Sequence, residues 1–446
     1  MRSALLIFLV LVGSLLLRLS FDPIVRGDSG HYLKVSTNLV EHGCYSNVSQ
    51  PTAGCHPTYG GKPPGYGLFL AVVRGTLGAG LNHIVAAQSA FFIISVALVV
   101  AAAPVAGTWR AFMAFGLAFS PLTLPWSAQI MPTTVSAGLT LCVTAALLRS
   151  IGRAKFSLGL VSLPLAAAVT VRWEQVWLFV AILIVAVWLY RPSRAALKIG
   201  IILVLVLSPA ALWGLRTVAA EQAIWPGNLW EPGRPAGAIK FFKASALTQE
   251  VVKAFQWPIL GRKYSNIASR FPYSAIPSTL DTPRLHGLMR DLSGVPNGEP
   301  VPTHIDQGFQ SEAEHFQQTQ PIHAYLAVPA IRAWFMWTGR DKFPKSGWQK
   351  LGAPFASCVA QAYKVLLCVS ALLILCLAVA QRNGFLACFA VAAIATTIAR
   401  TAFLVSIPVS AIEMRYLVSA VPIIEVLFLL SWPILLALQK LTTNKQ

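Results

Sequence analysis

Long apolar segments dominate this sequence and exclude most soluble folds. Hydrophobic residues make up 56% of the 446 residues, only 11% are charged, and the mean hydropathy is +0.63. A soluble domain carries about 25% charged residues, because its surface has to face water. The composition therefore indicates a polytopic membrane protein, and it excludes a cytosolic enzyme, a secreted disulfide scaffold and a disordered chain.

The apolar segments predict about ten transmembrane helices. The stretch 64–81 is not one of them, because it is short and glycine-rich and contains Arg74, a costly residue at bilayer depth. We interpret this stretch as an interfacial or re-entrant helix. The predicted spans lie near 4–18, 83–106, 109–127, 132–149, 156–171, 174–190, 199–214, 354–380, 384–407 and 416–438.

The basic residues between the spans orient the chain. If 64–81 does not cross, the clusters near 109–110, 149–155, 191–198, 382 and 440–445 fall on the same side as Arg2. The positive-inside rule then places both termini in the cytoplasm. We expect a multi-pass protein of a bacterial inner membrane, with its functional face toward the periplasm or exterior.

This topology predicts an all-α polytopic membrane protein in three parts. The N-terminal module, 1–214, contains a first outer loop at 19–82. A mixed insertion, 215–353, follows on the outer face, and 354–446 forms the C-terminal helices.

The charge balance predicts an anionic partner. Lys and Arg total 35 against 16 Asp and Glu, so the net charge is +19. No basic run with interleaved aromatic residues lies in a soluble segment, which argues against nucleic acid. Membrane lipid headgroups and lipid phosphates are the expected partners, although positive-inside anchoring accounts for part of the excess.

The first outer loop contains the candidate chemistry. Asp28, His31 and Tyr32 fall within about one helical turn, and an aspartate here could act as a general base or metal ligand. Capping of the helical pattern 29–41 is the alternative for Asp28, and composition alone favours it. Lys62 precedes two prolines and is suited to a phosphate at headgroup level, with snorkelling as the alternative.

Two cysteines, Cys44 and Cys55, lie in this loop. An oxidising exterior would allow a disulfide between them. Two free thiols are the alternative.

The order of several motifs resembles that of the GT-C glycosyltransferases, closest to the protein O-mannosyltransferases and lipid A aminoarabinose transferases. Asp28 follows the first span, Gly43-Cys44-Tyr45 forms a G-x-Y, and Lys62-Pro-Pro-Gly-Tyr66 follows. Arg172-Trp-Glu174 is similar to the family's Arg-x-Glu pattern. Glu413-Met-Arg415-Tyr416, with Pro422 after it, is similar to the family's E-x-R-Y…P.

The resemblance implies a GT-C-like bundle and inverting transfer of a sugar from a polyprenyl-phosphate carrier. Asp28 would be the catalytic carboxylate, Lys62 and Arg415 would hold the lipid phosphate, and His31, Tyr32, Arg172, Glu174 and Glu413 would lie at the substrate site. The family often has Asp-Glu where this chain has Asp28-Ser29. A divalent metal at Asp28 therefore stays open, and no other cofactor is expected.

Several alternatives remain at this stage. The pairs Arg172/Glu174 and Glu413/Arg415 could be structural ion pairs at the membrane surface. The chain could also be a transporter or flippase of a lipid-linked glycan, although no internal symmetry supports this, or an assembly subunit. Mannose, aminoarabinose, arabinofuranose, glucose and galacturonate all fit as the sugar, and lipid A, a glycan or an exported protein such as pilin fits as the acceptor.

Overall fold

The computed structural model divides the chain into two compact units. The first contains residues 1–226, 340–400 and 417–446, and the second contains 227–339 and 401–416. Within the described residues the regular elements are helices, with one isolated β-bridge between Ile24 and Gln129. The described ranges are 2–47, 62–155, 157–190, 192–221, 235–247, 249–251, 254–255, 257–260, 262–280, 282–338, 353–406 and 415–443.

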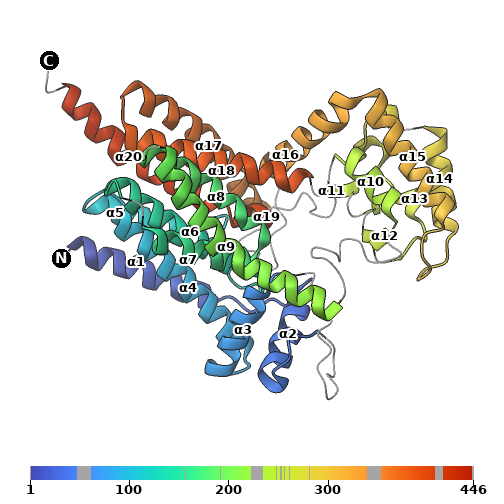
Figure 1. The fold of residues 1–446 in the computed structure, drawn as a ribbon, viewed down its shortest axis with the longest axis horizontal. Helices are drawn as coiled ribbons and strands as arrows, with labels where there is room; N and C mark the ends of the chain where they lie inside the picture. The colour runs from blue at the N-terminus through green and yellow to red at the C-terminus, as the bar shows by residue number, and fades with distance from the viewer. Residues whose placement is uncertain are drawn as a thin grey trace. The chain divides into compact units, whose positions relative to one another are not determined.

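The first unit is built from helices, as Figure 1 shows, and this confirms the prediction of an all-α membrane protein. Six described helices are long and apolar enough to cross a bilayer, and three shorter apolar helices accompany them. The six are α1 (Arg2–Leu19), α4 (Leu81–Ala102), α6 (Pro132–Gly152), α9 (Pro192–Glu221), α17 (Ala353–Ala380) and α18 (Gly384–Ser406). The shorter ones are α7 (Leu158–Val171), α8 (Leu178–Leu189), which the 3-10 turn η2 (Trp173–Trp177) precedes, and the apolar stretch Val421–Ile434 of α20 (Val421–Thr443), which the short α19 (Arg415–Val418) precedes.

The span predicted over 109–127 is not one continuous helix. Helix α5 (Thr108–Ala118) ends early, and only the short η1 (Leu124–Trp126) follows before α6. Pro121 and Pro125 explain the break, because proline lacks the N–H that a helix interior requires.

The stretch 64–81 forms one short helix, α3 (Pro64–Leu77), before α4 begins. Helix α2 (Ser29–His42) packs against α3, and α3 also contacts α4 and α7. At 1.5 Å per residue, the 14 residues of α3 span only about 21 Å. This is shorter than the roughly 30 Å apolar core of a bilayer.

Helix α6 lies at the centre of the first unit. It packs against α4, α7, α8 and α20, and almost all its residues are buried. Its sequence is rich in Ser, Thr, Ala and Gly, which let helices approach closely. Gly138 illustrates this, because a Cβ there would lie 2.8 Å from the ring of Phe91.

The second unit is built from short helices around a core rich in phenylalanine. Phe241, Phe255 and Phe309 contact one another with ring centroids 5.4 to 5.8 Å apart. Buried Arg332 caps α10 by donating to the carbonyls of Phe242, Lys243 and Ala246. The helices are α10 (Ala236–Ser245), α11 (Gln249–Val251), α12 (Trp257–Leu260), α13 (Ile267–Arg270), α14 (Pro283–Gly294), α15 (Thr303–Thr319) and α16 (Val328–Thr338), with 3-10 turns η5 (Tyr273–Ala275) and η6 (Ser278–Leu280) and the π-turn η7 (His323–Ala327).

Candidate functional site

Asp28 and Lys62 form an ion pair between the starts of α2 and α3. The Lys62 Nζ lies 2.5 Å from the Asp28 Oδ1, and the Asp28 side chain is 46% exposed. Asp28 occupies the N-cap position of α2, but its side chain makes no capping hydrogen bond there. The carboxylate therefore pairs with a cation and stays accessible, which differs from the capping role that composition favoured.

Aromatic rings form the buried side of this pair. Tyr32 is buried, and its ring meets that of Tyr66 edge-on with centroids 5.0 Å apart. The Lys62 Nζ lies 5.1 Å from the centre of the Tyr32 ring. An aromatic face attracts a cation, so Tyr32 helps to hold the ammonium group in place.

A hydrogen-bonded chain anchors both halves of the pair to the helix bundle. The Tyr66 hydroxyl donates to the Gln88 Oε1, and the Gln88 Nε2 donates to the carbonyls of Ser127 and Gln129. The loop that contains Ser127 and Gln129 also pairs with the segment before Asp28. Ile24 donates a backbone hydrogen bond to Ala128 and accepts one from Ile130. Gln88 was missed by the sequence analysis, although a glutamine in an apolar span is a signal of function.

His31 lies beside the pair as a neutral group. Burial, then the positive charge of Lys62, lowers the pKa of His31 to about 4, despite the opposing effect of Asp28. Its Nδ1 lies 3.3 Å from the Asn47 Nδ2, a geometry in which the amide donates. At neutral pH His31 therefore adds a polar group and no charge.

The G-x-Y motif folds against the end of α9. Gly43 ends α2 with a positive φ of 64°, which glycine adopts without strain. The Tyr45 ring meets Trp213 edge-on at 4.6 Å, and the Arg216 Nη2 donates to the Tyr45 carbonyl. Cys44 is buried and disulfide-bonded, but Cys55 lies outside the described residues, so their pairing stays a prediction.

The start of α3 touches the end of α7. A Cβ on Gly65 would lie 2.7 to 2.8 Å from backbone atoms of Thr170 and Val171, so only glycine allows this approach. Gly65 is three residues from Lys62, and Thr170 is two residues from Arg172. The two motifs that contain Lys62 and Arg172 are thus brought together by direct backbone packing.

Arg172 and Glu174 form a second ion pair in η2. Both the Nη2 and the Nε of Arg172 lie 2.6 Å from the Glu174 Oε1. Both side chains are largely buried, and a second guanidinium, that of Arg400 in α18, lies 3.9 Å from the same carboxylate oxygen. Arg400 was not among the predicted site residues, although an arginine inside the apolar stretch 384–407 is itself a signal.

The remaining predicted site residues fall outside the described part of the chain. Glu413 is one of them, and only the backbone of Arg415 is described, at the start of α19. Their predicted roles stay predictions.

The described residues around Asp28 do not suit a divalent cation. No group of three His, Cys, Asp or Glu side chains that could hold a metal is found among the described residues. The Lys62 ammonium also lies against the one carboxylate that was a candidate ligand. We therefore derive no chemistry through a metal.

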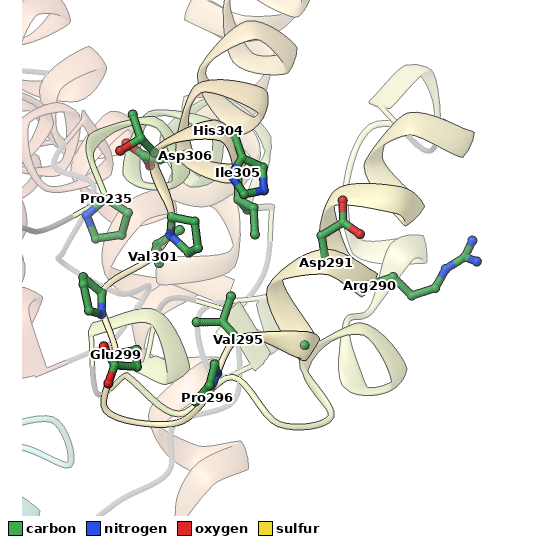
Figure 2. Close-up of a pocket in the computed structure, with 14 residues that line it drawn as sticks. Pro235, Arg290, Asp291, Val295, Pro296, Glu299, Val301, His304, Ile305 and Asp306 are labelled. Atoms are coloured by element: carbon green, nitrogen blue, oxygen red, sulfur yellow. The ribbon is translucent and has the colours of Figure 1, made fainter.

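The second unit has a cavity of its own, of about 1050 Å³ (Figure 2). Asp291 from α14 and His304 and Asp306 from α15 line it, together with a proline-rich connection that includes Glu299. The Asp306 Oδ1 accepts a hydrogen bond from the Ala238 backbone, so this carboxylate serves the packing of the unit.

No protein-family model and no curated protein matches the sequence. The chain shows a likeness to two solved structures of ArnT from Cupriavidus metallidurans. The apo structure is 14% identical with a TM-score of 0.40, over 96% of this chain and 76% of that one. The structure bound to undecaprenyl phosphate is 16% identical with a TM-score of 0.37, over 91% of this chain and 77% of that one.

Proposed function

We propose that the chain is an integral-membrane glycosyltransferase that moves a sugar from a polyprenyl-phosphate carrier to a cell-envelope acceptor on the outer face. The ion pair between Asp28 and Lys62 carries the proposal, since its two ends lie at the starts of adjacent helices in the predicted outer loop. The pair supplies a carboxylate and an ammonium group at one accessible place, and an inverting transfer requires both charges.

The reaction assigns one role to each group. The acceptor hydroxyl oxygen forms a bond to the anomeric carbon while the bond from that carbon to the phosphate oxygen breaks. The electron pair of the broken bond leaves with the polyprenyl phosphate, and the acceptor proton passes to the Asp28 carboxylate. The Lys62 ammonium stabilises the negative charge that grows on the phosphate.

The short Asp28–Lys62 distance supports an ordered exchange of partners. A donor phosphate and the Asp28 carboxylate compete for the same ammonium group, because both are anions. A phosphate that binds Lys62 would release the Asp28 carboxylate. The released carboxylate could then accept the acceptor proton, so the base would become available only when the donor is bound.

The test supplies the purified full-length protein with labelled undecaprenyl-phosphate sugars and candidate acceptors. We expect Asp28→Asn to lower transfer by about 10²- to 10⁴-fold, the usual contribution of a general base. Asp22→Asn is the matched control, because Asp22 is an exposed aspartate of the same loop. Equal transfer by Asp28→Asn and wild-type protein, with both folded, would contradict the proposal.

Donor binding is tested separately from transfer, with undecaprenyl phosphate as the probe. We expect Lys62→Gln to weaken binding, and Arg74→Gln to leave it near the wild-type value. Arg74 is a suitable control because it lies on α3, the helix that follows Lys62, about 15 Å along the axis from Pro64.

The transporter alternative makes a different prediction in proteoliposomes. Movement of a lipid-linked glycan across the vesicle membrane, lost in Asp28→Asn, with no transfer to any acceptor supplied, would support a flippase and overturn the glycosyltransferase.

A further inference from the structure

The Arg400 guanidinium joins two segments that are far apart in the sequence. Its Nη1 donates to the Gln175 Oε1 at 2.9 Å, and its Nη2 donates to the Ser419 Oγ at 2.5 Å. The Arg400 side chain is only 1% exposed. Arg400 therefore links η2, which contains Glu174 and Gln175, to the turn between α19 and α20.

The same network extends to the start of the central helix α6. The Gln175 Nε2 donates to the carbonyl and hydroxyl oxygens of Ser136. The Thr140 hydroxyl donates to the Ser419 carbonyl at 2.5 Å. Gln175 and Ser419, which both bond Arg400, are thus bonded to α6 as well.

The charges of the network explain why Arg400 matters for Arg172. Glu174 lies between two guanidinium groups, at 2.6 Å from Arg172 and 3.9 Å from Arg400. A buried carboxylate is costly unless positive groups pair with it, so the positions of the two guanidinium groups determine where the Glu174 carboxylate lies. Arg400 fixes Glu174 from one side, and Glu174 fixes the Arg172 guanidinium from the other.

This network lies next to α3, which begins at Pro64, two residues after Lys62. The backbone at the end of α7 lies so close to Gly65 that a Cβ atom would not fit between them. Arg172 follows directly after α7. A displacement of η2 would therefore be transmitted to the start of α3 and to Lys62.

We propose that Arg400 is a positioning residue of the donor-phosphate site. It holds η2 and the α19–α20 turn at a fixed distance from each other, and so it fixes the positions of Arg172 and Lys62. This inference rests on the proposed function. Arg400 itself is buried, so its proposed role is to position other groups and not to bind the substrate directly.

The test uses two substitutions at the network and one control on the same helix. Arg400→Lys keeps the positive charge but lacks the planar fork that reaches Gln175 and Ser419 together. Ser419→Ala removes one neutral partner of Arg400 and keeps the charge pair between Arg400 and Glu174, so it disturbs the fold less than a substitution of the arginine. Thr397→Ala is the control, since the Thr397 hydroxyl donates to the carbonyl of Ala393 within its own helix.

Hydrogen exchange of the full-length protein in detergent gives a readout that does not depend on activity. We expect faster amide exchange at 172–177 and 417–421 in both Arg400→Lys and Ser419→Ala, with unchanged exchange elsewhere in the bundle. Exchange that is unchanged at both segments overturns the inference. Exchange that increases evenly over the bundle, with a lower melting temperature, overturns it too, because that is a purely structural effect.

Kinetics then connect the network to the donor. We expect Arg400→Lys to lower kcat/KM for the undecaprenyl-phosphate sugar by up to about 100-fold, the usual loss for a displacement of about 1 Å. The KM for the acceptor should not change. A wild-type protein that binds no undecaprenyl phosphate would contradict the proposed function, whereas the exchange experiment alone decides the link between the two segments.

Discussion

Gly65 lies directly against the backbone of Thr170, where a Cβ atom would be 2.7 Å from the Thr170 carbonyl carbon. The contact joins the Lys-Pro-Pro-Gly-Tyr segment to the helix that leads into Arg172. The Lys62 segment and the Arg172 segment can therefore lie this close together only because residue 65 has no Cβ atom.

Gly65→Ala should therefore destabilise the protein, because backbone atoms cannot yield to the added methyl group. We expect a loss of about 1–3 kcal/mol, typical of an overpacked site, together with weaker binding of undecaprenyl phosphate. Thermal unfolding in detergent measures the first effect. Gly75→Ala on the same helix is the control, since a Cβ there meets nothing within 4 Å. Equal unfolding temperatures for the two variants would refute the packing argument.

His31 should make the stability of the protein sensitive to mild acid. Its pKa is lowered to about 4 in the folded protein, while an unfolded histidine has a pKa of 6.5. Between these values the unfolded chain binds more protons than the folded one, so stability falls as the pH drops from 6.5 to 4. His31→Gln removes this contribution, so its melting temperature should fall less than that of the wild type between pH 7 and pH 5. Parallel curves for the two proteins would show that His31 does not titrate in this way.

Glu425 should be important for packing of the bundle. It is buried in α20 and accepts hydrogen bonds from the Ser120 and Tyr363 hydroxyl groups. Glu425→Ala leaves both hydroxyls without their partner, at a cost of about 1–3 kcal/mol for each buried group. Glu425→Gln, which still accepts, should cost less.

Ser431→Ala is the control for Glu425, because the Ser431 hydroxyl donates only to the Phe428 carbonyl of its own helix. Unfolding followed in detergent ranks the three variants. A ranking in which Ser431→Ala is as damaging as Glu425→Ala would argue against a special role for the carboxylate.

The candidate site was partly predictable from the sequence because some of its parts are local. Asp28, His31 and Tyr32 fall within one turn, and a lysine followed by two prolines starts a helix, so these relationships follow from neighbours in the chain. The capping interpretation of Asp28 had the same local basis, and it was wrong because Lys62, 34 residues later, competes for the carboxylate. The roles of Asp28 and Lys62 in transfer stay predictions.

The break in the span predicted over 109–127 has a local cause, the two prolines, and a distant one, the contacts that the chain makes after Ala118. Hydropathy alone favoured one continuous helix, since most residues of the segment are apolar. Pro121 and Pro125 were visible in the sequence, but the path of the chain after Ala118 depends on its surroundings. Glu425 bonds the Ser120 hydroxyl, and Gln88 bonds the carbonyls of Ser127 and Gln129.

The sequence by itself determined that this chain lies in a membrane and which segments are apolar, because the burial of apolar surface in lipid depends on composition over about twenty residues. Tertiary structure alone brought Arg400 to Gln175 and Ser419, and Gly65 to Thr170. These partners are separated by up to 225 residues. Only the packing of helices around α6 determines which buried polar groups find one another, since each must be satisfied by whichever neighbour the fold places within reach.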